Sequence, residues 1–393
     1  VKFLQENPDY HSIQGKVLTF NELYTKSNIR LRSYKGFESA APLDAPQAEQ
    51  RLINHMEKYV FTIYSLQKTF VWKRCIKQIY EGLWNKHVTS FEQITNIPKL
   101  LGSLLEQNFV INTTQEHLRQ KSADGTVKFV FEMHDGATVE GVLIPTTNRM
   151  TACVSSQVGC SLDCKFCATG YLKRVRNLAA YEIFDQVVMI DRVAKEMYNI
   201  KLSNIVYMGM GEPLLNYNNV IESVRKITDP NILGMSAKRI TISTSGIAKM
   251  IEKLADEDLK NHLALSLHAA NNEKRSAIMP INDSNNLEML TNAMQYWYHK
   301  TGTRPTLEYC VIEDTNESED EALELVKFAK QFPCKINLIE YNPISNATFT
   351  SAKSSKIDAF AAILENHNLV VNIRRSRGKD IDAACGQLAG KND

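Results

Sequence analysis

Predicted strands and helices alternate from about residue 151 to the end of this chain, and this alternation restricts the fold more than any other feature. Repeated strand–helix units predict a parallel sheet covered by helices. Six units fall short of the eight in a closed barrel, so we expect an open, partial (βα)6 barrel over residues 151–393, in the α/β class. The expected strands are 152–155, 204–208, 239–244, 263–268, 306–312 and 335–340, and the expected helices include 180–198, 219–227, 287–300, 320–331 and 354–366.

The N-terminal part of the chain has a different pattern. Residues 1–57 are polar with weak periodicity, and we leave this segment unassigned. Apolar residues then recur at helical spacing, and further helical sequence is interrupted at Pro98. These residues predict a small helical accessory domain over residues 58–112. RNA docking is one interpretation of its tryptophans and basic residues, but we expect Trp72 and Trp84 to build the domain's own core.

A short β-rich connector should join this domain to the barrel. Residues 128–133 alternate in polarity, Asp135-Gly136 is typical of a hairpin turn, and residues 138–144 read as a return strand. We therefore expect a connector over residues 113–150.

Composition excludes several classes of protein. The 393 residues are 44% hydrophobic and 23% charged, and the net charge of +2 carries no argument for a nucleic-acid partner. No apolar run reaches the ~18 residues of a membrane span. Eight cysteines are too few for a secreted disulfide framework. We expect a cytoplasmic monomer with no membrane association.

Three of the cysteines lie within eight residues. Cys160, Cys164 and Cys167 have the spacing C-x3-C-x2-C, with no fourth cysteine directly following. Structural zinc usually takes four ligands, so a zinc site or three incidental thiols is the weaker interpretation. Three thiolates can instead hold an iron–sulfur cluster that keeps one position open for chemistry.

Polar residues and glycines stand where the predicted strands end. Because ligands of parallel α/β folds bind beyond the carboxyl ends of the strands, these residues should share one site. Each of them alone could be an ordinary turn residue. The candidates are Gly211, Glu212, Ser243, Ser266, Leu267, His268 and Asn342.

Two further cysteines extend the pattern. Cys153 opens the run Cys-Val-Ser-Ser-Gln-Val-Gly-Cys, and Cys385 opens Cys-Gly-Gln-Leu-Ala-Gly near the C-terminus. With the C-x3-C-x2-C triplet, these motifs resemble the radical S-adenosylmethionine (SAM) enzymes that methylate C2 of adenine in 23S ribosomal RNA and transfer RNA. The resemblance extends from about residue 60 to the C-terminus.

The resemblance implies the cofactors and the site. The triplet would hold a [4Fe-4S] cluster, and the strand-end residues from Gly211 to Asn342 would bind SAM. Two SAM molecules serve each methylation, one as methyl donor and one as source of a 5′-deoxyadenosyl radical. An electron donor of the flavodoxin or ferredoxin type and a disulfide reductant are implied partners.

The same resemblance assigns three catalytic residues. Cys385 would carry a methyl group and form a covalent adduct with the RNA. Glu140 would accept the C2 proton, although a glutamate on an exposed strand face is the ordinary interpretation of this position. Cys153 would then attack Cys385, giving a transient disulfide that frees the methylated base.

RNA contacts are expected from two basic runs beside these cysteines. A solvated basic surface explains either run equally well. The runs are Lys173, Arg174 and Arg176, and Arg374, Arg375, Arg377 and Lys379.

Two alternative functions remain open on the motifs. An adenine-C8 methyltransferase of the same superfamily would use the same cysteines. A non-catalytic, metal-dependent RNA-binding module would have no SAM-cleaving activity.

Overall fold

The structure, a computed structural model, describes residues 31–34 and 69–389, and the chain divides into two compact units. The first unit comprises Val1–Thr113 with Asn231–Leu233, and the second comprises Thr114–Pro230 with Gly234–Asp393. Apart from strand β1 (Leu31–Tyr34), the segment that the sequence leaves unassigned, residues 1–57, lies outside the described residues.

The first unit contains the predicted helices. Helix α4 (Thr69–Trp84) buries Leu83 and Trp84, which are 0% and 1% exposed, so Trp84 is a core residue as expected. The side chain of Trp72 lies outside the described residues. The remaining elements are η1 (Phe91–Gln93), α5 (Lys99–Asn108) and β2 (Phe109–Ile111), which pairs with β1 antiparallel.

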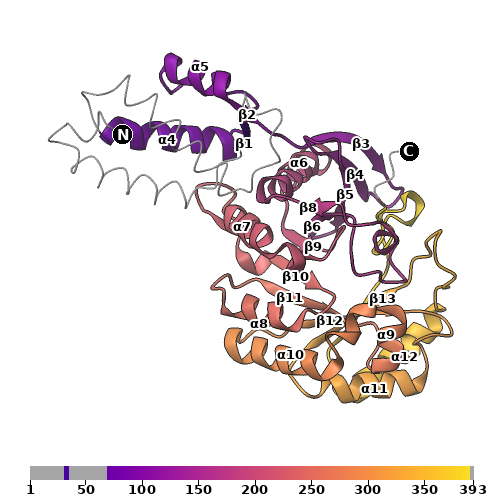
Figure 1. The fold of residues 1–393 in the computed structure, drawn as a ribbon. Helices are drawn as coiled ribbons and strands as arrows, with labels where there is room; N and C mark the ends of the chain where they lie inside the picture. Colours follow the sequence, from indigo (N-terminus) through magenta and orange to yellow (C-terminus); the bar gives the residue numbers. More distant parts are fainter. Residues whose placement is uncertain (1–30, 35–68, 390–393) are drawn as a thin grey trace. The chain divides into compact units, whose positions relative to one another are not determined.

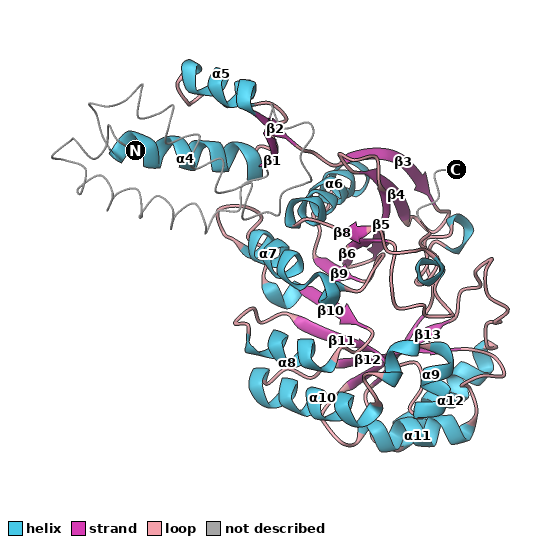
Figure 2. Cartoon of the chain, in the orientation of Figure 1, coloured by secondary structure: helices cyan, strands magenta, loops and turns pink. Residues whose placement is uncertain are grey.

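A ten-stranded sheet organises the second unit, in the order β14-β13-β12-β11-β10-β9-β6-β5-β4-β3 (Figures 1 and 2). Strands β3 to β6 pair antiparallel, and β6 onward to β14 pair parallel. The connector is thus continuous with the barrel sheet. The antiparallel strands are β3 (Gln115–Lys121), β4 (Val127–Glu132), β5 (Thr138–Thr146) and β6 (Arg149–Cys153).

All six predicted barrel strands are present, and a seventh, β14 (Val371–Arg374), extends the sheet. Most of their apolar residues are buried, as expected for a parallel sheet covered by helices, whereas those of the edge strand β14 are partly exposed. The other parallel strands are β9 (Asn204–Tyr207), β10 (Ile240–Thr244), β11 (His262–Ser266), β12 (Thr306–Val311) and β13 (Lys335–Glu340).

Helices follow the barrel strands, and Figure 2 shows several of them along one side of β10 to β13. Local sequence sets their ends: Ser318 and Glu321 form a capping box, and Gly302 terminates a helix with φ of 65°. The helices are α6 (Ala180–Tyr198), α7 (Tyr217–Thr228), α8 (Ala248–Asp256), α9 (Asn272–Ile278), α10 (Leu287–Thr301), α11 (Glu319–Ala329) and α12 (Ser354–Asn366). Within residues 31–34 and 69–389, no helix is long and apolar enough to cross a membrane.

Candidate active site

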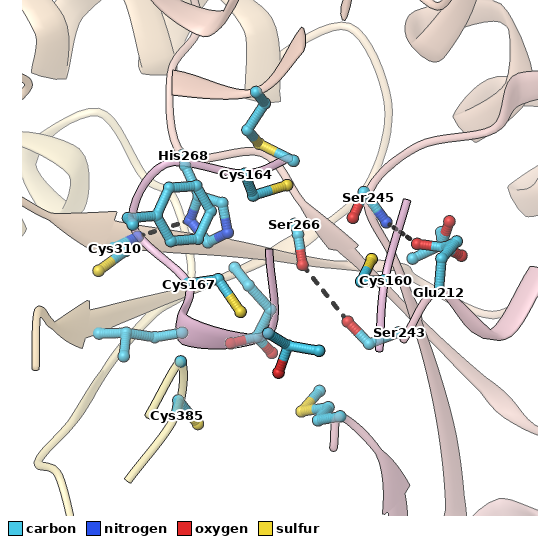
Figure 3. Close-up of a pocket in the computed structure, with 18 of the residues that line it drawn as sticks. Cys160, Cys164, Cys167, Glu212, Ser243, Ser245, Ser266, His268, Cys310 and Cys385 are labelled. Atoms are coloured by element: carbon cyan, nitrogen blue, oxygen red, sulfur yellow. Dashed lines mark hydrogen bonds between the residues drawn. The ribbon is translucent and has the colours of Figure 1, made fainter. Parts of the chain in front are cut away.

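A pocket with a cavity volume of about 160 Å³ lies at the carboxyl ends of the parallel strands. Figure 3 shows the side chains of the cysteine triplet around this pocket, with Cys385 nearby on the C-terminal segment. Nine of the predicted site residues line it together, although they come from distant parts of the chain. They are Cys160, Cys164, Cys167, Gly211, Glu212, Ser243, Ser266, His268 and Cys385.

The cysteine triplet lies on a tight loop between the short strands β7 (Gln157–Val158) and β8 (Arg176–Asn177). The amide of Cys167 donates to the carbonyl of Cys164 at 3.2 Å. A Cβ atom on Gly170 would approach the Cys164 carbonyl oxygen to 2.5 Å, so the loop closes only around a glycine.

The triplet suits a cluster better than a single ion. Burial raises the pKa of the Cys160 thiol to about 11 and raises the pKa of Cys164 as well, so these sulfurs need a cation to become thiolates. Within the described residues, no three His, Cys, Asp or Glu side chains are arranged to hold one metal ion. In a [4Fe-4S] cluster each thiolate binds a different iron, so convergence on one point is not required.

Glu212 is a buried carboxylate held by backbone amides. It is 2% exposed, and its oxygens accept from the amides of Ser245 at 2.7 Å and Leu214 at 3.0 Å. Burial raises the pKa of Glu212 despite these bonds. The preceding Gly211 has φ of 92°, and a Cβ there would overlap Gln157. The loop can therefore present Glu212 only with glycine before it.

Neighbouring strand ends contribute neutral polar groups. The hydroxyls of Ser243 and Ser266 lie 3.5 Å apart. The amide of Cys310 donates to Nδ1 of His268 at 2.9 Å, and burial lowers the pKa of His268 to about 3. The imidazole is therefore neutral with its proton on Nε2, which makes Nε2 a hydrogen-bond donor. The ring of Phe166 packs edge-on against the imidazole of His268, with 4.6 Å between the two ring centroids.

The C-terminal segment is hydrogen-bonded to the cysteine loop. The carbonyl of Gly386 accepts from the Ala168 amide at 2.7 Å, and the carbonyl of Leu388 accepts from the Thr169 hydroxyl at 2.6 Å. Cys385 itself is exposed. The C-terminal segment that carries Cys385 therefore lies against the cysteine loop.

Asn342 and Leu267 reach the site indirectly. The side-chain amide of Asn342 donates to the Cys385 carbonyl at 3.2 Å, so it contacts the C-terminal segment and does not line the pocket. Leu267 is fully buried, and its amide donates to the Glu308 carbonyl at 3.0 Å. Leu267 therefore lies between the pocket residues Ser266 and His268 without lining the pocket itself.

Glu140 and Cys153 lie on adjacent strands outside the pocket lining. Glu140 is 1% exposed, so the exposed strand face that is ordinary for a glutamate does not apply here. One of its oxygens accepts from the Ala389 amide at 2.7 Å, four residues beyond Cys385. Cys153 is buried, and burial followed by the nearby Cys385 raises the pKa of its thiol to about 12.

Two pocket residues have roles that the sequence does not predict. Arg374, expected to contact phosphate, instead lines the pocket and donates to Glu308 at 3.1 Å. Burial alone would lower the pKa of Arg374, but the neighbouring Cys385 and Glu308 outweigh it and raise that pKa. A glutamate inside the otherwise apolar run 306–312 is the sequence signal that could have revealed this pair.

Most of the other basic side chains in the two runs already have carboxylate partners. Arg176 pairs with Asp135 at 2.6 Å and with Glu182 at 2.8 Å. The second run is paired similarly, whereas Lys173 and Arg174 are exposed. The pairs of the second run are Arg375 with Glu340 and Asp358, Arg377 with Asp124, and Lys379 with Glu340.

Comparisons with known proteins agree with this geometry. The Radical SAM superfamily model matches residues 154–329. A protein of Cytophaga hutchinsonii named "Probable dual-specificity RNA methyltransferase RlmN" is 56% identical over 315 residues, covering 80% of this chain and 86% of the relative. The chain belongs to the dual-specificity RNA methyltransferase family of the radical SAM superfamily.

More distant members of the family match equally completely. The protein of the same name from Streptococcus mutans is 41% identical and covers 79% of this chain and 87% of its own length. The crystal structure of a radical SAM methyltransferase from Sphaerobacter thermophilus matches with a TM-score of 0.76 and 37% identity, over 80% of this chain and 92% of that one. The superfamily match includes the cysteine triplet, whereas Glu140 and Cys385 lie outside it.

Proposed function

We propose that this protein methylates C2 of an adenosine in 23S ribosomal RNA and in transfer RNA through a methyl group carried on Cys385. One observation carries the proposal: Cys385 lines the same pocket as the triplet Cys160, Cys164 and Cys167. A cluster alone would indicate radical chemistry in general. An additional exposed thiol at the pocket indicates group transfer through the protein.

The pocket residues fit the two cofactors of the superfamily. Cys160, Cys164 and Cys167 would hold a [4Fe-4S] cluster, which when bound supplies the electron that cleaves SAM. Buried Glu212 suits the ammonium group of SAM, because a charge-assisted bond in a desolvated site is strong. Ser243, Ser266 and the Nε2 proton of His268 offer hydrogen bonds to its other polar atoms.

Cys385 acts as the methyl carrier. Adenine C2 is electron-poor and cannot attack a methyl donor, so the methyl group must first be placed on another atom. The Cys385 thiolate displaces it from SAM, and its exposure leaves the sulfur accessible to both SAM and RNA. The target adenine must be unstacked to reach the pocket.

A SAM molecule held at the cluster would supply a 5′-deoxyadenosyl radical, which would remove a hydrogen atom from the S-methyl group of Cys385 and leave a carbon radical that adds to adenine C2. The surplus electron on the ring would pass back to the cluster.

Glu140 and Cys153 then complete the reaction. Glu140 accepts the C2 proton. The Cys153 thiolate then attacks the sulfur of Cys385, the carbon–sulfur bond breaks, and its electron pair and a proton form the product methyl group. The Cys153–Cys385 disulfide requires a reductant, and the cluster requires a flavodoxin- or ferredoxin-type donor. Both needs suit a monomer in the reducing cytoplasm.

Substitution of Cys153 tests the proposal directly. Cys153→Ala should leave the enzyme covalently attached to RNA, because no thiol remains to release the adduct. Denaturing gels with labelled RNA measure the adduct, and Cys385→Ala, which keeps the cluster cysteines, should show neither adduct nor methyl transfer. Clean turnover by Cys153→Ala would exclude this mechanism.

Mass spectrometry of the product separates the two alternative functions. A methyl group on C8 would identify the sister activity. Anaerobically purified protein with no iron–sulfur chromophore and no SAM cleavage would identify an RNA-binding module instead.

A further inference from the structure

A buried ion pair lies behind the C-terminal segment. The ammonium nitrogen of Lys128 is 3.5 Å from Oε1 of Glu140, and the two side chains are 7% and 1% exposed. Glu140 pairs with Val130 across β4 and β5, so Lys128 is its diagonal neighbour on the same face of the sheet. Lysine is rarely buried to this degree without a partner.

The two oxygens of Glu140 have different surroundings. Oε2 accepts the Ala389 amide at 2.7 Å. Within the part of the chain that the structure describes, Oε1 has no hydrogen-bond partner, and its ion-pair partner is Lys128. Oε1 therefore keeps lone pairs available for a proton while Oε2 is engaged by the segment that follows Cys385.

We propose that Lys128 is a positioning residue for proton transfer, pairing with the Glu140 carboxylate and orienting it so that Oε1 accepts the proton from adenine C2. This inference rests on the proposed function. Burying a carboxylate without an opposite charge is unfavourable, so the buried position of Glu140 calls for a paired cation. The Ala389 amide that binds Oε2 belongs to the C-terminal segment, whereas Lys128 lies on β4. The charge of Lys128 therefore lies beside Glu140 regardless of where the C-terminal segment is.

The proton transfer itself moves one proton and no electron, and the one surplus electron left on the ring by radical addition would pass to the cluster that Cys160, Cys164 and Cys167 would hold. The C2–H bond breaks, its electron pair stays in the ring system, and the proton passes to Oε1. Glu140 becomes neutral while Lys128 remains an ammonium ion. The backbone of Glu140 contacts uncharged groups, namely the Ser155 hydroxyl at 2.6 Å and the Met210 sulfur at 3.3 Å.

Cys153, on the strand beside Glu140, does not replace Lys128 as the compensating group. A cysteine side chain is either a neutral thiol or a negatively charged thiolate, so it offers no positive charge to a carboxylate. Lys128 is thus the cation that the structure pairs with this carboxylate.

Lys128→Met tests the role by removing the charge and keeping the length of the side chain. We expect this variant to accumulate the covalent RNA adduct, with decay that slows further when adenine C2 carries deuterium. Lys128→Arg should restore release and remove the isotope effect. The matched control is Lys195→Met, which breaks an exposed ion pair with Asp191 on α6 and should behave as wild type.

Two measurements separate this inference from the proposed function. The S-methyl content of Cys385 and SAM cleavage should equal wild type in Lys128→Met, and their absence from the wild-type enzyme would overturn the proposed function itself. Wild-type release of product by Lys128→Met, or an adduct without an isotope effect, would overturn the role of Lys128 alone. If Lys128→Met does not fold, Lys128→Gln, which is neutral but polar, gives the same decision.

Discussion

Cys153 illustrates how burial sets the chemistry of a single residue. Its thiol is 6% exposed at the end of β6, and burial raises its pKa to about 12. Only a small fraction is the nucleophilic thiolate near neutral pH. In the proposed mechanism, such a poorly ionised thiol leaves time for the preceding steps before it attacks Cys385.

Release of the adduct should therefore accelerate as the pH rises. Below a pKa of about 12, the thiolate fraction of Cys153 grows about tenfold per pH unit. We expect the single-turnover decay of the wild-type adduct to follow this slope from about pH 7 to pH 9. The comparison is Cys153→Ser, whose residual decay should lack the slope, and a flat wild-type profile would contradict the expectation.

At the residue scale, sequence predicts ligands better than it predicts burial. The triplet Cys160, Cys164 and Cys167 follows from spacing alone, because three close cysteines have few other uses. The buried position of Glu140 could not be predicted, because it results from the packing of the C-terminal segment over β5. The Glu308–Arg374 pair was missed because its members are 66 residues apart.

At the scale of elements, the cysteine loop depends on how closely β7 and β8 approach. Gly159 has φ of 73°, and a Cβ on it would overlap the carbonyl of Lys173 in the opposite arm. No other residue allows this approach without moving the backbone. The loop geometry that orients the cysteines is thus set beside the first of them.

Gly159→Ala should reduce cluster binding. The displaced arm would move Cys160 relative to Cys164 and Cys167, so we expect the variant to lose most of its iron and sulfide after anaerobic reconstitution. The matched control is Gly302→Ala, where φ is also positive but the Cβ would meet nothing within 4 Å. That control should cost about 1 kcal/mol of stability and keep its iron. Equal iron content in both variants would refute the role of Gly159.

Element prediction succeeds where elements are long and strongly patterned. The bounds of α6 and α12 agree with the sequence expectation, because each has three or more turns of periodic apolar residues. Short elements such as α9, with seven residues, and β14, with four, carry too little pattern to be found. Their positions depend on tertiary contacts.

Across the whole molecule, the turn between β3 and β4 holds the chain just before Cys385. Asp124 pairs with Arg377 at 3.1 Å and accepts from the Gly378 amide at 3.0 Å. Asp380 in turn accepts from the Ser122 hydroxyl at 2.6 Å. The segment that leads to Cys385, the proposed methyl carrier, is thus held by a hairpin more than 250 residues earlier in the chain.

Asp124→Asn should weaken the attachment of the segment before Cys385 to the β3–β4 turn. It should also change how the stability of the protein depends on pH in acid. Burial alone would raise the pKa of Asp124, but hydrogen bonds from Thr126 and Gly378 outweigh it and lower the pKa from 3.8 to about 2. The stabilisation is thus present above pH 4 and is lost as the pH falls toward 2. We expect the free energy of unfolding of the variant, measured by denaturant titration at pH 7, to be about 1 kcal/mol lower than that of the wild type. The loss is no larger because the ion pair is partly exposed to solvent.

The same substitution should leave the C-terminal segment more open to proteolysis at neutral pH. Near pH 2, where the wild-type carboxyl group becomes protonated, the two proteins should converge in stability. A constant difference in stability across that range would show that Asp124 does not act through its charge.

Strand β6 joins two kinds of pairing, antiparallel to β5 on one side and parallel to β9 on the other. If evolution or an engineer excised the barrel at residue 151, the strand would be cut within its own length and one row of its amide and carbonyl groups would face water. Such a bare edge invites pairing with other chains. The connector is therefore a solubility element as well as the carrier of Glu140. Any minimal version of this catalyst must keep it.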